Sequence, residues 1–322
     1  MSLSNFIGNL KALLMDQIVK LSVIIPCFNG AATLATQLEA LVSQSWSEPW
    51  EIIVADNAST DNSVEVAQKF IGKFPALQIV KVGHSKRLAS FARNMGVKAA
   101  NAPLLAFCDA DDEVDSEWVS AMGNALLENN VVCGKFQFDK FNESGIAKRS
   151  ADVWKNGLYQ GRFLPGGGSG NFGIQKWLHV AIGGFDECLP HAEDADYFWR
   201  LQLEGFRLHY EPKAMIQIRI GRINPTLSSL YRRSRNRFAS NYWCYKRYEK
   251  FGMLPPPSIR ESLVKWIHLL RQGVKMQSQS MTQKNRWRQE LAQYTGELIG
   301  QFHGRLTNPC VPYHPGSLNG LS

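Results

Sequence analysis

Apolar runs and helical patterns alternate along the first third of the chain. Each run ends in a proline, a glycine or an aspartate, as is typical of short buried strands. The segments between the runs repeat apolar side chains every three to four positions, which predicts amphipathic helices. We expect strands over 21–25, 51–55, 77–82 and 104–108, and helices over 31–45, 63–74 and 89–100. This alternation predicts an α/β fold, with a mostly parallel (mixed) sheet flanked by helices.

The pattern changes after residue 115 and becomes richer in helices towards the end of the chain. We expect a helix over 116–129, an edge strand over 131–138, irregular structure over 139–164, a glycine-rich loop over 166–173, helices over 174–182 and 192–204, strands over 208–211 and 215–220, and helices over 228–251, 259–276 and 282–302. The expected organisation is an N-terminal amphipathic helix over 1–20, an α/β domain over 21–220, a helical region rich in basic and aromatic residues over 221–305, and a tail over 306–322.

The net charge of +8 is concentrated in one segment. Nine basic residues and one acid lie between Arg219 and Lys250, which accounts for the whole excess. This distribution favours a localised anionic partner over general affinity for nucleic acid. The six cysteines are scattered, as expected of reduced thiols in the cytoplasm. No apolar run reaches the ~18 residues that span a bilayer, and we expect no signal peptide.

An acidic cluster, Asp109-Ala110-Asp111-Asp112, directly follows the apolar run 104–108. Carboxylates at the end of a buried strand lie where open α/β sheets bind ligands, and two of them can share a hard divalent cation. A solvated acidic loop is the alternative. Residues 26–29 and 56–57 follow two other strands, and right-handed crossovers would bring all three ends to the same edge of the sheet. The sequence therefore predicts a site at this edge.

Six short motifs, taken in order, resemble the inverting nucleotide-sugar glycosyltransferases of family 2, which have the GT-A fold. They are residues 22–29 (SVIIPCFN), 54–61 (VADNASTD), 92–96 (ARNMG), 107–112 (FCDADD), 183–187 (GGFDE) and 193–194 (ED). The resemblance covers roughly residues 20–215. It implies a GT-A domain with a helical C-terminal appendage. The implied reaction moves a sugar from a nucleoside-diphosphate-sugar to a hydroxyl group, as in the synthesis of polysaccharides or cell-surface glycans.

The resemblance places the donor nucleotide at the ends of the first two strands. Pro26, Phe28 and Asn29 would line its site, where Phe28 either packs on the nucleobase or is an ordinary core side chain. Asp56 and Asn57 would hydrogen-bond the edge of a pyrimidine. The family often has two acids here, so Asn57 is a departure that leaves the nucleotide open, with a UDP-sugar as our first expectation. The alternative role of this turn is capping of the following helix.

The resemblance assigns the diphosphate and a metal to the next two motifs. Arg93 would reach the nucleotide or its phosphates, the alternative being a solvated surface arginine. Asp111 would bind Mg²⁺ or Mn²⁺. Asp109 would share the metal shell or hold the sugar or ribose, with Ala110 beside it. Such a cation offsets the charge that develops on the departing nucleoside diphosphate.

Glu193 and Asp194 open a helix, where carboxylates are favoured by the helix dipole whether or not they have a further role. In the family, the aspartate of this pair is the general base, so Asp194 is the first candidate and Glu193 the second. The base accepts the proton of the acceptor hydroxyl as its oxygen attacks the anomeric carbon. By the same resemblance, Gly170 and Asn171 of the glycine-rich loop would line the acceptor sugar.

The basic and aromatic helix over 228–250 has three open interpretations. It could lie on the anionic surface of the inner face of a membrane, where the enzyme would meet a lipid-linked acceptor. It could bind phosphate groups of a substrate or of nucleic acid. It could also be a solvated helix packed by its aromatic side chains. We expect a saccharide or lipid-linked acceptor and a cytoplasmic location with peripheral membrane contact; binding of nucleic acid is not expected.

Three other functions are weighed against the glycosyltransferase. A sugar-1-phosphate nucleotidyltransferase shares the sheet architecture but needs a glycine-rich, arginine-containing loop after the first strand, where this chain has Pro26 to Gly30. A nucleic-acid-binding module would leave the acidic motifs without a purpose. Residues 168–173 fit the G-x-G-x-x-G pattern of a dinucleotide site, but residues 183–190 cannot form the second strand that such a site needs.

Overall fold

An eight-stranded sheet, in the order β3-β2-β1-β4-β7-β6-β8-β5, forms the centre of the computed structural model. The structure describes residues 18–318 except 75, 84–87, 155, 221–224, 274–275, 277, 311–312 and 317. Most of the helix predicted over 1–20 therefore lies outside the described residues.

The first half of the sheet is parallel, as predicted. It consists of β1 (Leu21–Cys27), β2 (Trp50–Asp56), β3 (Leu77–Lys81) and β4 (Leu104–Cys108). The side chains of β1, β2 and β4 are buried on both faces, because helices cover the two sides of the sheet. Their carboxyl ends meet at one edge, where Cys27 pairs with Asp56 and β4 ends at Cys108.

The second half of the sheet corrects several predictions. It contains β5 (Glu113–Val114), β6 (Val131–Gln137), β7 (Asn171–Gln175) and β8 (His209–Gln217). The edge-strand prediction for 131–138 is wrong, since β6 lies between β7 and β8. The helix predicted from residue 174 begins at Lys176, because β7 extends to Gln175 and runs antiparallel to β4. The strands predicted over 208–211 and 215–220 are one strand, β8, whose register with β6 shifts after Gly134.

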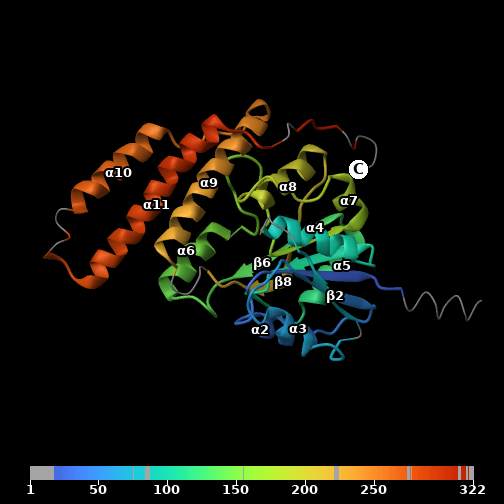
Figure 1. The fold of residues 1–322 in the computed structure, drawn as a ribbon. Helices are drawn as coiled ribbons and strands as arrows, with labels where there is room; N and C mark the ends of the chain where they lie inside the picture. The colour runs from blue at the N-terminus through green and yellow to red at the C-terminus, as the bar shows by residue number, and fades with distance from the viewer. Residues whose placement is uncertain are drawn as a thin grey trace, which may run out of the picture.

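Helices pack on both faces of this sheet (Figure 1). One face is covered by α2 (Leu34–Val42), α3 (Ser63–Gln68) and α5 (Trp118–Glu128). The other carries α4 (Ala89–Ala99), α7 (Lys176–Ala181) and α8 (Glu193–Leu203). An additional helix, α6 (Ser144–Trp154), lies within the segment that was predicted to be irregular. None of the side chains of α6 is buried.

The C-terminal region is helical, as predicted, and forms a layer beside the sheet domain (Figure 1). It consists of α9 (Leu227–Tyr248), the short η1 (Glu249–Phe251), α10 (Ile259–Gly273) and α11 (Met281–Leu306). Helices α9 and α11 approach closely because three glycines of α11 face the backbone of α9. A Cβ atom added at Gly296 or Gly300 would lie 2.3 Å from a carbonyl oxygen of α9, and one added at Gly304 would lie 2.9 Å from another.

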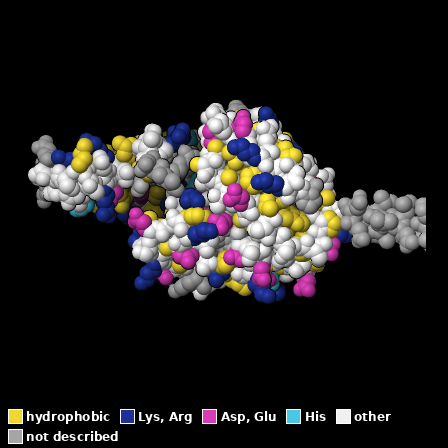
Figure 2. All heavy atoms as spheres, turned by 90° about the horizontal axis from the view of Figure 1, so that it is seen from below, with side chains coloured by type: hydrophobic (Ala, Val, Ile, Leu, Met, Phe, Trp, Pro, Cys, Tyr) yellow, Lys and Arg dark blue, Asp and Glu magenta, His cyan; other side chains and the backbone are white. Residues whose placement is uncertain are grey.

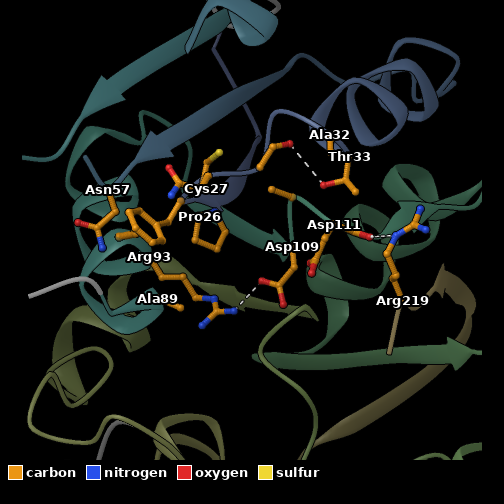
Figure 3. Close-up of a pocket in the computed structure, with 15 residues that line it drawn as sticks. Pro26, Cys27, Ala32, Thr33, Asn57, Ala89, Arg93, Asp109, Asp111 and Arg219 are labelled. Carbon is orange, nitrogen blue, oxygen red and sulfur yellow. Dashed lines mark hydrogen bonds and ion pairs between the residues drawn. The ribbon is translucent and has the colours of Figure 1, made fainter. Parts of the chain in front are cut away.

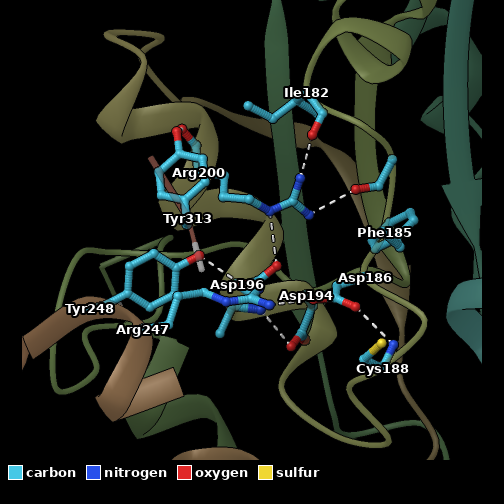
Figure 4. A network of polar contacts seen from close by, with 12 residues as sticks. Ile182, Phe185, Asp186, Cys188, Asp194, Asp196, Arg200, Arg247, Tyr248 and Tyr313 are labelled. Carbon is cyan, nitrogen blue, oxygen red and sulfur yellow. Dashed lines mark hydrogen bonds and ion pairs between the residues drawn. The ribbon is translucent and has the colours of Figure 1, made fainter. Parts of the chain in front are cut away.

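A buried charged network joins α9 to the sheet domain (Figure 4). Asp196 of α8 is fully buried and accepts hydrogen bonds from Arg200 Nε at 2.9 Å, Arg247 Nη1 at 2.6 Å and the Tyr248 hydroxyl at 2.6 Å. Arg247 also donates to Asp186 at 2.7 Å. Opposite charges in a buried site stabilise one another only when their hydrogen bonds are satisfied. The network therefore fixes the position of α9 relative to α8.

The C-terminal helices project as an arm from the globular part (Figure 2). In this view from below, both parts carry Lys and Arg side chains on their surface, and acidic side chains are interspersed among them on the globular part. Within the described part of the chain, no helix combines the length and the apolar character needed to cross a membrane.

Candidate active site

A hollow of about 610 Å³ opens at the carboxyl ends of β1, β2 and β4 (Figure 3). Its volume lies in the usual range for small-molecule sites. The polar edge predicted from the sequence is therefore a concave surface. The predicted donor-site and metal-site residues among its lining are Pro26, Phe28, Asn29, Asn57, Arg93, Asp109, Ala110 and Asp111.

The loops after β1 and β2 are tied together by hydrogen bonds. Asn29, with a φ of 53°, donates its N–H to Ser59 Oγ at 2.9 Å and accepts from the N–H of Thr60 at 2.8 Å. Asp56 is buried, and one of its carboxylate oxygens accepts from the Ser59 N–H at 3.3 Å. Its other oxygen has no hydrogen-bond partner among the described residues. A buried acceptor of this kind suits an N–H group of a ligand.

Arg93 links the acidic cluster to the start of α8. It is buried, and its Nη2 donates to Asp109 Oδ1 at 2.6 Å, while Nη1 lies 3.5 Å from Glu193 Oε1. Burial lowers the pKa of Arg93, but the charges of Asp109 and Glu193 outweigh it and the net shift is upward. Its Nε has no hydrogen-bond acceptor among the described residues. Arg93 is thus a buried cation whose Nε–H group is available to a ligand, and it is not a solvated surface arginine.

Three carboxylates lie together at the end of β4. Ligand atoms of Asp109, Asp111 and Asp112 are within 4.8 Å of one another. Asp112 is buried and accepts the N–H of Arg219 at 2.9 Å; burial, together with the charges of the other two aspartates, raises its pKa to about 9. Oxygen donors at this spacing fit a hard divalent cation, which would relieve the repulsion among them. Neither Asp112 nor Arg219 was among the predicted site residues, although Asp112 stood in the cluster.

The start of α8 carries the two candidate bases. Ala192 precedes it with a φ of 63°, and the carboxylate of Asp194 accepts the N–H of Ala195 at 2.7 Å. Burial and the neighbouring charge of Asp194 raise the pKa of Glu193 to about 7, although Arg93 opposes this shift. Asp194 is not among the residues that line the hollow, whereas its neighbour Glu193 contacts Arg93, which does line it.

The two predicted acceptor residues occupy different environments. A Cβ atom at Gly170 would lie 2.6 Å from Asp109 Oδ2, so only glycine allows the loop to approach the acidic cluster this closely. Asn171, in contrast, is fully buried in β7. Its side chain accepts from Trp118 Nε1 at 2.8 Å and donates to the carbonyls of Lys135 and Ala214. The structure does not bring this side chain to the hollow, and its contacts give it a structural role.

Comparisons with known proteins agree with this geometry. Residues 22–184 match the protein family described as Glycosyl transferase family 2. An uncharacterized glycosyltransferase of Escherichia coli K12, YibD, is 35% identical over 170 residues, which cover 52% of this chain and 48% of that protein. The chondroitin synthase of Pasteurella multocida is 31% identical over 112 residues, which cover 35% of this chain and 12% of that protein. The chain thus spans less than half the length of these curated relatives.

Solved structures resemble most of the chain. Residues 1–349 of S. aureus TarS in complex with UDP give a TM-score of 0.51 at 14% identity, covering 89% of this chain and 92% of that one. The same protein in complex with UDP-GlcNAc gives 0.51 at 16% identity, covering 90% and 93%. At this identity the likeness shows the fold alone. It confirms the GT-A-type sheet and helices predicted from the sequence.

Proposed function

Because the chain belongs to glycosyl transferase family 2, we propose that it transfers a sugar from a nucleoside-diphosphate-sugar to a hydroxyl of a saccharide or lipid-linked acceptor. The reaction serves polysaccharide or cell-surface glycan synthesis and inverts the anomeric centre. A UDP-sugar is the donor expected first, since the TarS structures that share the fold were solved with UDP and UDP-GlcNAc. The family match favours this function over a nucleotidyltransferase or a nucleic-acid-binding module.

One observation carries the proposal: the buried Arg93 bridges the acidic cluster and the start of α8 beside a hollow of suitable size. Phe28 and Asn57 in the hollow, and the buried Asp56 oxygen next to it, provide a ring face and hydrogen-bonding groups for a nucleobase. Asp109 and Asp111, with Asp112 beside them, are the residues that would hold Mg²⁺ or Mn²⁺. When bound, such a cation supplies Lewis-acid stabilisation of the leaving diphosphate.

Transfer follows a single displacement at the anomeric carbon. Asp194 accepts the proton of the acceptor hydroxyl, whose oxygen forms the new bond as the bond to the diphosphate breaks and its electron pair leaves with the nucleotide. Glu193 is the second candidate for this role. Glu193 is held by Arg93, whereas Asp194 accepts, among the described residues, a side-chain hydrogen bond on one carboxylate oxygen only, so that its second oxygen can serve a substrate. Asp194 is therefore preferred.

The proposal includes a cytoplasmic location with peripheral contact of the 228–250 segment with an anionic membrane. Its basic side chains support such contact, since each lysine or arginine near an anionic surface adds about 1 kcal/mol. Co-sedimentation with vesicles of anionic lipid at low salt tests this part separately. Failure to sediment would remove the membrane from the proposal and leave the reaction unaffected.

Thermal shift with a panel of nucleotides, in the presence and absence of Mn²⁺, tests the donor site. The proposal expects a nucleoside diphosphate, UDP first, to raise the melting temperature only when the metal is present. Asp111→Ala should abolish this increase, and Asp139→Ala, which removes an exposed acid outside the hollow, should retain it. Stabilisation by no nucleotide under either condition would contradict the proposal.

A further inference from the structure

A second hollow, of about 390 Å³, adjoins the donor hollow and shares Phe28 with it. It lies between the first turns of α9 and the loop that precedes α8. Its polar lining comes from His191 on the loop and from Ser229, Arg232, Arg233 and Asn236 on α9. None of these residues belongs to the predicted donor, metal or base groups.

The positive charge around this hollow is uncompensated. Arg232 and Arg233 are exposed, and neither forms a salt bridge with any residue that the structure describes. The sequence contains no acid between Arg219 and Glu249. Two adjacent arginines without an acidic partner repel one another, and such an arrangement indicates a functional site.

The hollow adjoins the loop that leads into α8. His191, which lines it, lies two residues before Glu193, where α8 begins. A ligand held here would therefore lie beside both the arginines of α9 and this loop. The donor diphosphate already has Arg93 and the acidic cluster on the other side of Phe28.

We propose that the second hollow binds a phosphate group of the acceptor, and hence that the acceptor is a phosphate-bearing saccharide or polyol chain. This inference rests on the proposed function and specifies its substrate class. Guanidinium groups match phosphate oxygens in geometry and charge, and Ser229 and Asn236 can add neutral hydrogen bonds. Anchoring the phosphate next to the donor hollow, with which this hollow shares Phe28, positions a nearby hydroxyl for attack on the donor sugar.

The experiment measures binding of sn-glycerol 3-phosphate, by calorimetry, to protein already saturated with UDP and Mg²⁺. Filling the donor hollow first separates an acceptor phosphate from the donor diphosphate. Single variants Arg232→Ala and Arg233→Ala should each weaken glycerol phosphate binding roughly tenfold, as expected for loss of a charged hydrogen bond. Arg271→Ala, an equally exposed arginine on α10, is the matched control and should bind as the wild type does. Glycerol, which lacks the phosphate, should not bind.

Each outcome bears on the inference. Equal binding of glycerol phosphate by the Arg232 and Arg233 variants would overturn it. A loss of UDP affinity in these variants, with no change for glycerol phosphate, would assign the arginines to the donor diphosphate and overturn it as well. Wild-type protein that binds UDP but not glycerol phosphate overturns this inference alone. Wild-type protein that fails to bind UDP contradicts the proposed function instead.

Discussion

The guanidinium of Arg93 donates a 2.6 Å hydrogen bond to the carboxylate of Asp109, joining helix α4 to the end of strand β4. The same side chain pairs with Glu193 at 3.5 Å. Three segments that are far apart in the sequence are thus held around one buried cation. This arrangement orients the acidic cluster towards the hollow and connects it to the start of α8.

Replacing Arg93 by lysine should weaken donor binding while leaving the fold intact. Lysine keeps the positive charge, but it lacks the planar guanidinium whose several N–H groups let Arg93 contact two carboxylates at once. We expect UDP affinity in the presence of Mn²⁺ to fall roughly tenfold, the effect of one charged hydrogen bond. Calorimetry measures this change, with Lys98→Arg, at an exposed position of the same helix, as the control. Unchanged affinity in Arg93→Lys would show that the guanidinium does not contribute to the donor site.

Glu193→Gln should stabilise the protein at alkaline pH. Because burial raises the pKa of Glu193 from 4.5 to about 7, the folded protein binds this proton more tightly than the unfolded chain. The wild type therefore loses stability as the pH rises from 4.5 to 7, and the glutamine variant does not. The free energy of unfolding of the variant relative to wild type should increase by about 1–3 kcal/mol between pH 5 and pH 8. Urea unfolding at the two pH values measures this increase. A stability difference that is the same at both pH values would contradict the raised pKa of the half-buried Glu193.

Gly300→Ala should loosen the contact between α9 and α11. An added Cβ would lie 2.3 Å from the carbonyl oxygen of Arg235, so the helices must move apart. Overpacking of this kind costs about 1–3 kcal/mol, which chemical unfolding can resolve. Gly145→Ala, in the exposed helix α6, is the control, because the nearest atom to its Cβ is 3.7 Å away. The account requires the control to be neutral or stabilising, as alanine normally is in a helix.

Asp196→Asn should destabilise the protein strongly. The substitution leaves Arg200 and Arg247 without the buried carboxylate that both contact. Loss of one partner from a buried charged network costs about 3–5 kcal/mol. Asp139→Asn, at an exposed position, should change the free energy of unfolding by no more than about 0.5 kcal/mol. Similar stability of the two variants would mean that the network does not hold α9 in place.

The strands β1, β2 and β4 could be predicted because they are buried on both faces, which leaves uninterrupted apolar runs in the sequence. The position of β6 inside the sheet could not be predicted, because strand order depends on pairing between segments that are distant in the sequence. The strand β7 was missed because it directly follows the glycine-rich stretch 166–170, and α6 because none of its side chains is buried in the core.

The site likewise has features that the sequence could predict and features that it could not. The resemblance to the family indicated Arg93 and Asp111, and both line the hollow. The contact between Arg93 and Glu193 is a tertiary one across a hundred positions, for which a single sequence carries no signal. The sequence also could not show that the side-chain amide of Asn171 accepts a hydrogen bond from Trp118 and donates to two backbone carbonyls. The second hollow likewise exists only because α9 folds back against the loop before α8.

The rate of UDP release by hydrolysis of a UDP-sugar in the presence of Mn²⁺, with water taking the place of the acceptor hydroxyl, tests the central claim most directly when the wild type is compared with Asp194→Asn. The account predicts that the variant binds UDP as the wild type does, within about twofold, but releases it at least 100-fold more slowly, since a general base contributes about 10²–10⁴-fold. An Asp194→Asn protein that turns over at the wild-type rate would contradict it.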